Sequence, residues 1–232
     1  MARKPRIAVI LDENTSGDAS RYELSKGCFT AIRDAGGLPF GIAYLPELVA
    51  IVFEEFDGLL CTGGRFAYPV EWYLGDQPSR APPSERFDIE RKMIEGYLER
   101  DKPVLGLCAG MQLLAGVHGC RLWSDVQQYA PTVAEHDKND HQHPVSILPN
   151  SRLADLVGAS RLLVNTSHRE AIGEVSQSVL VSARSDDGVI EAIEVPDRLF
   201  ALGLQWHQER YAGSDHPGNG VFRGFIEACG AA

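Results

Sequence analysis

Residues 103–112 read PVLGLCAGMQ, and the fold expected for the whole chain follows from this stretch. A short apolar run, Val104–Leu107, leads into Cys108, which has a glycine two positions before it and another two positions after it. A sharp turn from strand to helix holds the residue at its apex in a strained backbone conformation and leaves room only for small neighbours. The stretch therefore predicts a nucleophile elbow, with the sulfur of Cys108 above the strand ends.

The elbow also predicts the electrostatic surroundings of this sulfur. The amide of Ala109 and the start of the following helix offer donors to a developing negative charge. The same helix N-terminus lowers the pKa of a thiol from its ordinary value of about 8.5. An isolated cysteine in an apolar run is more often a buried structural residue. The two flanking glycines and the switch from strand to helix favour a reactive Cys108 instead.

Strands and helices alternate on both sides of the elbow. Before it, the pattern predicts strands at 6–11, 38–44 and 57–61 and helices at 22–35, 46–53 and 85–100. After the elbow helix at 111–116, it predicts strands at 145–148, 161–164, 178–182, 189–193 and 200–204, a helical turn at 152–157 and a closing helix at 220–228. This alternation is typical of an open, doubly wound, mostly parallel α/β sheet with helices on both faces. The later strands lie close together in sequence and are expected to be partly antiparallel. Without a linker or internal repeat, one domain is expected over residues 1–232.

The composition limits the partners and the compartment. The 232 residues carry a net charge of −10, and no cluster of Lys and Arg stands out, so neither nucleic acid nor a membrane surface is an expected partner. The apolar run near the N-terminus is short and ends in acidic residues, so no signal peptide is expected and the predicted location is cytoplasmic. The five scattered cysteines lack a C-x-x-C spacing, which favours a reduced compartment. A homo-oligomer remains open.

A histidine-rich and acidic stretch lies within residues 119–145. It contains side chains of the types that bind zinc or nickel, namely His136, Asp137, Asp140, His141 and His143. No two of them stand at an i, i+4 interval on a predicted helix, and the surrounding sequence is polar. We therefore expect an exposed loop between short strands, with no metal site and no cofactor.

A cysteine nucleophile needs a base and a group that orients the base. Among the seven histidines, His207 follows a predicted strand directly, in ALGLQWHQER, which places it on the same edge of the sheet as Cys108. Glu209 lies two residues further on, where its carboxylate could accept the second imidazole N–H. Gly64 ends a Gly-Gly pair on this edge, where a backbone amide could approach a substrate, although a plain tight turn explains such a pair equally well.

The segments GLCAGMQ and GLQWHQE together resemble the paired signature of the class I glutamine amidotransferase superfamily, whose fold is flavodoxin-like. The segments LLCTGG, HPVSILPNSRLADL, VNTSHREAI and DGVIEAIE, in this order, further resemble the γ-glutamyl-γ-aminobutyrate hydrolases and related γ-glutamyl peptidases. The chain differs from the usual pattern at Ala109, where many of these hydrolases have Arg, and at Gln208, where the histidine motif usually has Pro.

The resemblance implies a role for each matching residue. Cys108 would be the nucleophile, His207 the base and then the acid, and Glu209 the orienting carboxylate. The amides of Gly64 and Ala109 would form an oxyanion hole. Contacts to the γ-glutamyl group would come from Gln112, Ser167 and His168. The implied reaction is hydrolysis of the γ-glutamyl amide bond of a small molecule through a thioester, without a cofactor.

Two other functions stay open on the sequence. The chain could be a glutaminase subunit that delivers ammonia to a separate synthetase partner. It could also be a binding protein on the same fold without catalytic activity, although an intact Cys108, His207 and Glu209 argue against that. The released amine and the pathway do not follow from the sequence.

Overall fold

The computed structural model describes residues 3–14, 20–75, 78–129, 135–139 and 141–231. Within these residues, nine strands form one sheet in the order β4-β1-β5-β6-β13-β12-β11-β8-β9. The parallel half consists of β4 (Leu38–Ile42), β1 (Arg6–Ile10), β5 (Gly58–Cys61), β6 (Val104–Leu107) and β13 (Ala201–Leu204). The antiparallel half consists of β12 (Ile190–Glu194), β11 (Leu180–Ser185), β8 (His141–Ile147) and β9 (Arg161–Thr166).

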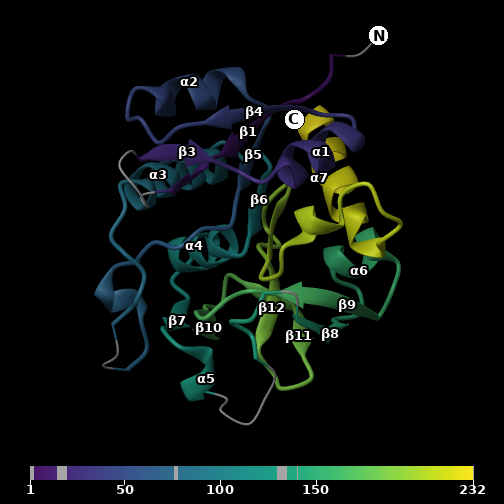
Figure 1. The fold of residues 1–232 in the computed structure, drawn as a ribbon. Coiled ribbons are helices and arrows are strands. Elements are labelled where there is room, and N and C mark those ends of the chain that lie inside the picture. Colours follow the sequence, from purple (N-terminus) through teal and green to yellow (C-terminus); the bar gives the residue numbers. More distant parts are fainter. Residues whose placement is uncertain (1–2, 15–19, 76–77, 130–134, 140, 232) are drawn as a thin grey trace.

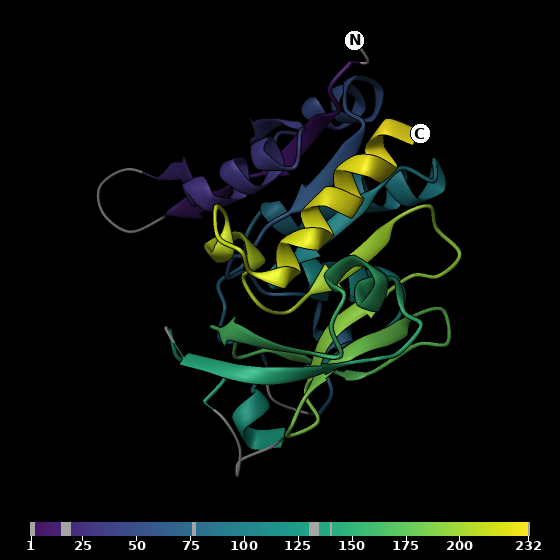
Figure 2. The same cartoon turned by 90° about the vertical axis from the view of Figure 1, so that its right-hand side faces the viewer.

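Helices cover both faces of this sheet (Figure 1). One face carries α2 (Leu48–Glu55), α3 (Arg86–Glu99) and α4 (Ala109–Val117), and the other carries α1 (Lys26–Asp34), α6 (Arg152–Val157) and α7 (Gly220–Ala231). Figure 2 shows α1 and α7 in front of the parallel strands, with the chain termini at the same end of the molecule. The doubly wound, mostly parallel sheet predicted from the alternation of strands and helices is confirmed.

The strand sequences are apolar throughout because both faces of the sheet are covered. In β1, Ala8 and Ile10 face the core beneath α3 and α4, whereas Ile7 and Val9 face the core beneath α1 and α7. All four side chains are at most 1% exposed. This packing holds the carboxyl ends of β5, β6 and β13 rigidly along one edge, which is where the candidate site lies.

Shorter elements complete the described fold. They are β2 (Asp12–Asn14), β3 (Arg21–Glu23), β7 (Arg121–Trp123), α5 (Val126–Tyr129), β10 (Ala171–Glu174) and the 3₁₀ helices η1 (Val70–Trp72), η2 (Gln208–Tyr211) and η3 (Pro217–Asn219). The antiparallel pair β10–β7 lies below α4 in Figure 1. No helix in the described segments is long and apolar enough to cross a membrane.

Two predictions about local structure were wrong. The helix expected from residue 22 begins at Lys26, because Arg21–Glu23 pairs with Asp12–Asn14 as a strand and the Ser25 hydroxyl accepts a hydrogen bond from the amide of Gly27 at the helix start. The exposed loop expected in the middle of residues 119–145 does lie between short strands, β7 and β8, but β8 begins at His141, within the histidine-rich stretch, and α5 follows β7. The second wrong prediction matters more, because some residues of this stretch belong to a buried cluster of side chains.

That cluster includes two of the five residues of the histidine-rich stretch. His136 is 0% exposed and His143 is 5% exposed, so neither belongs to a solvated loop. His143 lies on β8, whose pairing with β9 runs from His141 to Ser146. Strand pairing and burial thus override the polar composition of this stretch. Asp140 lies outside the described residues.

Candidate active site

Cys108 occupies the turn between β6 and α4 and has the strained backbone expected of a nucleophile elbow. Its φ is 50° and its ψ is −106°, and it is one of the described non-glycine residues with positive φ. Its amide donates to the carbonyl of Leu204 over 2.7 Å, which ties the elbow to the neighbouring strand β13. The elbow predicted from PVLGLCAGMQ is present in the fold.

The glycines around the elbow are required by close approach. A Cβ at Gly106 would come within 2.6 Å of the carbonyl carbon of Gly110, and a Cβ at Gly110 would come within 2.3 Å of the carbonyl oxygen of Cys61. Side chains do not tolerate such distances, so α4 can start directly against β5 and β6 only if these positions are small. This is the crowding that the two glycines predicted.

His207 lies beside Cys108 because their strands pair in parallel. Leu204 at the end of β13 is aligned with Leu107 at the end of β6, so the residues that follow both strands meet at one edge. The imidazole interacts with the thiol of Cys108, and its Nδ1 lies 2.7 Å from Oε1 of Glu209. The structure therefore brings the three residues of the predicted triad together.

The pKa values of the two reacting groups, Cys108 and His207, are shifted in opposite directions. Burial alone would raise the pKa of Cys108, but the positive charge of His207 and its hydrogen bond outweigh burial and lower it. Burial would likewise lower the pKa of His207, but the thiolate of Cys108 and the hydrogen bond to Glu209 raise it to about 10. Both shifts favour the form of the pair that has a thiolate and an imidazolium.

Asn165, which the sequence analysis did not single out, positions the histidine. Its side-chain amide donates to the carbonyl of His207 over 2.9 Å and accepts from the His207 amide over 3.0 Å. Asn165 lies at the end of β9, a strand on the far edge of the sheet. The sequence offered no signal for this contact beyond its closeness to Ser167 and His168.

Gly63 and Gly64 lie across the cleft from α4, and neither has a positive φ. A Cβ at Gly63 would come within 2.6 Å of Cε1 of His207, so the position must be glycine for the imidazole to fit. Close approach therefore explains the pair, and a turn with left-handed backbone does not.

Arg86 fixes the loop of Gly63 and Gly64 through hydrogen bonds to its backbone. Its guanidinium, 1% exposed, donates to the carbonyls of Thr62 over 2.6 Å and Gly63 over 3.0 Å and is paired with Glu90. In a trans peptide the N–H points opposite to the C=O. Because the Gly63 carbonyl points at Arg86, the amide of Gly64 faces the opposite way. Arg86 is a second positioning residue that the sequence analysis missed, since a buried arginine on a helix has no local signature.

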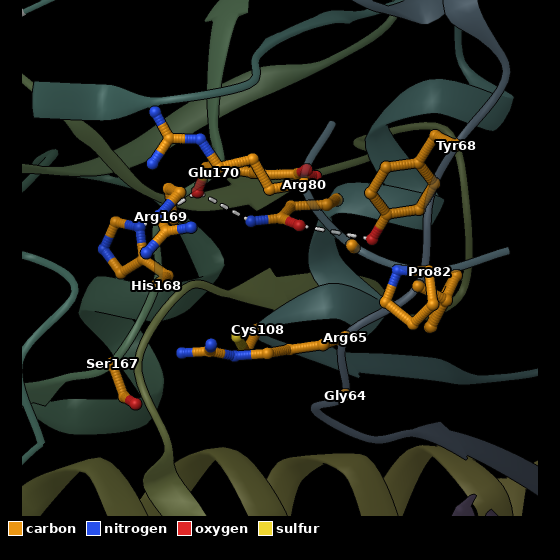
Figure 3. Close-up of a pocket in the computed structure, with 13 residues that line it drawn as sticks. Gly64, Arg65, Tyr68, Arg80, Pro82, Cys108, Ser167, His168, Arg169 and Glu170 are labelled. Carbon is orange, nitrogen blue, oxygen red and sulfur yellow. Dashed lines mark hydrogen bonds between the residues drawn. The ribbon is translucent and has the colours of Figure 1, made fainter. Parts of the chain in front are cut away.

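Two cavities meet at Cys108. The inner one has a volume of about 250 Å³, and Figure 3 shows the side chains that surround it. It is lined by Gly64, Arg65, Phe66, Tyr68, Arg80, Ala81, Pro82, Cys108, Gln112, Ser167, His168, Arg169 and Glu170. The outer one, of about 810 Å³, contains His207 and Glu209 together with the carboxylates of Asp12, Glu13 and Glu23. Cys108 thus lies where a bond joining the contents of the two cavities would be attacked.

The three residues expected to contact substrate all line the inner cavity, and their polar groups other than Nε2 of His168 already have partners. Nε2 of Gln112 donates to the carbonyl of Glu170 and to Gln205, and its Oε1 accepts from Tyr68. The hydroxyl of Ser167 donates to Asn139 over 2.6 Å. Nδ1 of His168 lies 3.0 Å from the Glu170 carbonyl. These residues shape the cavity walls.

Gln208, which replaces the usual proline of the histidine motif, has a structural use of its own. Its side chain is buried, accepts from the indole N–H of Trp206 over 2.8 Å and donates to Asn219 over 2.9 Å. These bonds fasten the turn after His207 to the start of η3 and α7. The departure from the motif therefore leaves the placement of His207 intact.

A separate buried group of side chains has the composition of a metal site. It consists of His136, His143 and Glu191, whose imidazole and carboxylate groups are ligands for transition metals, with Nε2 of His168 3.6 Å from Oε1 of Glu191 beside them. Only His168 also lines the inner cavity.

Comparison with solved structures places the fold among glutaminase-type proteins. The chain is similar to a proposed GMP synthase protein from Thermoplasma acidophilum, with a TM-score of 0.67 and 18% identity, covering 100% of this chain and 96% of that one. It is also similar to the glutaminase domain of the Trypanosoma brucei CTPS with bound acivicin, with a TM-score of 0.65 and 17% identity, covering 97% and 93%. At these identities, the likeness concerns the fold.

Comparison with known sequences identifies the family. The chain is 31% identical over 210 residues to Protein NtpR from Enterococcus hirae, covering 87% of each chain. It is 30% identical over 240 residues to the γ-glutamyl-γ-aminobutyrate hydrolase of Escherichia coli O157:H7, covering 97% of this chain and 93% of the relative. The model of the Peptidase C26 family matches residues 6–209. The chain therefore belongs to the Peptidase C26 family, and the resemblance to class I glutamine amidotransferase-like proteins predicted from its motifs is confirmed.

Proposed function

We propose that the protein hydrolyses the γ-glutamyl amide bond of a small molecule, with Cys108 as nucleophile. Membership of the Peptidase C26 family establishes the coarser class, a hydrolase or amidotransferase-like enzyme. The observation that carries the proposal is the elbow cysteine, which lies beside a histidine that is itself 2.7 Å from a buried carboxylate. This arrangement makes a thiolate next to a proton donor, which is what acyl transfer from an amide requires.

In the first half of the reaction, the Cys108 thiolate attacks the amide carbonyl and forms a tetrahedral oxyanion. The amides of Gly64 and Ala109 are the donors we assign to this oxygen. Ala109 is the first residue of α4, so its N–H has no partner within the helix. The bond from Arg86 to the Gly63 carbonyl supports the role of Gly64, because it turns the Gly64 amide away from Arg86.

In the second half, protons move through His207. The imidazolium protonates the leaving amine as the tetrahedral species collapses to a thioester. The neutral imidazole then takes a proton from water, which attacks the thioester, and the free acid and the thiolate are restored. Glu209 holds Nδ1 throughout and keeps Nε2 directed to the reacting atoms.

We place the γ-glutamyl group in the inner cavity, whose charges match those of glutamate. Arg65, Arg80 and Arg169 line it and can bind the α-carboxylate, while the half-buried Glu170 carboxylate can face the α-ammonium group. Gln112 and His168 complete the walls, and Ser167 lies at the boundary with the outer cavity. The volume of about 250 Å³ suits an acyl group of this size better than a peptide.

The leaving amine then occupies the outer cavity. A glutaminase subunit, which releases only ammonia to a synthetase partner, is the second candidate and shares the same chemistry. The outer cavity of about 810 Å³ supports the first candidate, since ammonia needs no such space. Its lining by Glu13 and Glu23 further supports an amine that carries a positive charge.

The test is amine release from a panel of γ-glutamyl compounds. The panel contains glutamine, γ-glutamyl-γ-aminobutyrate and γ-glutamyl amides of a neutral amine and of a diamine. Cys108→Ala is the blank, and Cys120→Ala, which removes a buried cysteine outside both cavities, is the matched control. We expect one γ-glutamyl amide to be cleaved faster than glutamine, with full activity in Cys120→Ala and none in Cys108→Ala.

Two outcomes would contradict the proposal. Turnover that survives in Cys108→Ala would exclude the cysteine mechanism. Glutamine cleavage that exceeds that of every amide, and that rises on addition of a synthetase, would favour the glutaminase subunit.

A further inference from the structure

Four buried side chains from separate segments converge at the centre of the antiparallel half of the sheet. His143 comes from β8, Glu191 from β12, His136 from the segment before β8, and His168 from the segment between β9 and β10. They are 5%, 0%, 0% and 3% exposed, respectively. We call these four residues the histidine cluster.

The distances within the histidine cluster are too long for hydrogen bonds. Oε1 of Glu191 lies 3.6 Å from Nδ1 of His136, 3.5 Å from Nε2 of His143 and 3.6 Å from Nε2 of His168. Each of these three nitrogens, and both oxygens of Glu191, are buried without a hydrogen-bond partner. Groups of this kind are costly to bury unless something compensates them.

The opposite nitrogen of each imidazole is directed at an oxygen that can only accept. Nε2 of His136 lies 2.8 Å from Asp187, Nδ1 of His168 lies 3.0 Å from the Glu170 carbonyl, and Nδ1 of His143 lies 3.4 Å from the Pro144 carbonyl. An oxygen acceptor holds the N–H of a neutral imidazole on its own side. The inward nitrogens of His136 and His143 therefore present lone pairs to the Glu191 carboxylate, and these groups repel one another unless a cation lies between them.

The spacing fits a tetrahedral metal ion. With metal–ligand distances of about 2.0 to 2.2 Å, adjacent ligand atoms of a zinc site are roughly 3.4 Å apart. The three nitrogen–oxygen distances of 3.5 to 3.6 Å are close to this value. The ligand atoms of His136, His143 and Glu191 all lie within 4.8 Å of one another. A proton shared between imidazole and carboxylate would instead draw the pair to hydrogen-bond distance, about 2.7 to 2.9 Å.

We propose that the histidine cluster binds one divalent transition-metal ion, best matched by Zn²⁺, through His136, His143 and the Glu191 carboxylate, with His168 approaching as the fourth ligand. The contacts of the outer nitrogens, above all the carboxylate of Asp187 on His136, are those that orient metal-binding histidines. The ion would join the strands β8 and β12 to the segment that carries His168. Since Ser167, Arg169 and Glu170 of that segment line the inner cavity, the ion would stabilise the cavity wall.

The experiment is a Zn²⁺ titration of metal-free full-length protein, and it needs no turnover. It is carried out on the wild type and on Cys108→Ala, because the thiolate beside His207 could itself bind zinc. We expect one Zn²⁺ per chain at the histidine cluster in Cys108→Ala. Replacement by Co²⁺ should give the intense visible absorption of four-coordinate cobalt, without a thiolate charge-transfer band.

Variants in the Cys108→Ala background locate the ion. Glu191→Gln keeps the shape of the side chain and should weaken Zn²⁺ binding by at least about 100-fold, as should His143→Ala. His118→Ala, which changes a histidine at the C-terminal end of α4, is the control and should bind as tightly as its parent. Circular dichroism checks that each variant folds.

Each outcome decides the proposal. The absence of saturable Zn²⁺ binding in Cys108→Ala, or a weak six-coordinate Co²⁺ spectrum, would overturn it. Equal affinity in Glu191→Gln and its parent would place the ion elsewhere. If both ligand variants fail to fold, the stoichiometry and the cobalt spectrum of Cys108→Ala decide.

Discussion

Two groups of histidine and glutamate lie near the inner cavity, and they differ in one distance. In the predicted triad, Nδ1 of His207 lies 2.7 Å from Glu209. In the histidine cluster, three imidazole nitrogens lie 3.5 to 3.6 Å from Glu191. The same two residue types meet in both places, so composition does not separate them. The distance does, because 2.7 Å fits a shared proton and 3.5 Å fits two ligands of one ion.

The backbone around each group explains the difference. His207 and Glu209 are two residues apart on one short turn, so a single segment sets their spacing. The members of the histidine cluster come from four segments, and the sheet holds apart the two strands among them, β8 with His143 and β12 with Glu191. A short turn can bring a donor onto an acceptor, whereas a rigid sheet can hold lone pairs at a separation that suits an ion.

The matched pair Glu209→Gln and Glu191→Gln gives the largest expected contrast. Each exchange keeps the shape of the side chain and removes its charge. Glu209→Gln should lower kcat by about 10²- to 10⁴-fold, because the imidazole loses the group that orients it and supports its charge. Glu191→Gln should change kcat by less than about 5-fold while weakening Zn²⁺ binding. Equal losses of kcat would show that the two groups do not have separate roles.

The pH dependence of turnover should report on the triad alone. With the pKa of Cys108 lowered and that of His207 raised to about 10, the thiolate–imidazolium pair exists between these two values. Below the Cys108 pKa the thiolate is protonated, and above about 10 the imidazolium has lost the proton that the leaving amine needs. We expect kcat/KM to fall by up to about tenfold per pH unit beyond either limit.

The rate of inactivation by iodoacetamide tests the acidic limb of the pH profile separately, since this rate depends on the thiolate alone. It should fall with the same apparent pKa as kcat/KM on the acidic side and show no loss above a pH of about 10. If kcat/KM and the rate of alkylation fell with different apparent pKa values on the acidic side, the acidic limb of kcat/KM would not report the titration of Cys108. His118→Ala, at the C-terminal end of α4 and outside both cavities, is the control and should leave both profiles unchanged.

Asn165→Ala tests how strictly His207 must be placed. The variant removes both hydrogen bonds between the Asn165 side chain and the His207 backbone. We expect kcat to fall by roughly tenfold with little change in KM, because the imidazole is less well aligned while the inner cavity is intact. Asn165→Asp retains the acceptor for the His207 amide and should recover part of the rate. An unchanged kcat in Asn165→Ala would show that the turn holds His207 without help.

Zinc should stabilise the fold by a modest amount if the histidine cluster binds it. At a free concentration about 100 times the Kd, binding to the native state adds about 2.7 kcal/mol to the free energy of unfolding. For a chain of this size, that corresponds to a rise in Tm of roughly 5 to 10 °C. Scanning calorimetry of Cys108→Ala with and without Zn²⁺ measures it. The same rise in Glu191→Gln would assign the stabilisation to another site.

Features that depend on neighbouring residues could be predicted from the amino-acid sequence. The elbow follows from Gly106, Cys108 and Gly110, and the pairing of His207 with Glu209 follows from their spacing after a strand. The alternation of apolar strands and amphipathic helices predicted the doubly wound sheet. Each of these features is local, so the side chains that cause it lie within a few residues of one another.

Contacts between distant residues became visible only in the folded chain. Asn165 reaches His207 across the antiparallel half of the sheet, and Arg86 reaches Gly63 from a helix 23 positions further along the chain. The histidine cluster draws on residues 136 to 191, and the polar sequence around His136 and His143 predicted the opposite of their burial. Strand order brings these residues together, and strand order depends on the packing of the whole sheet, which no short stretch of sequence encodes.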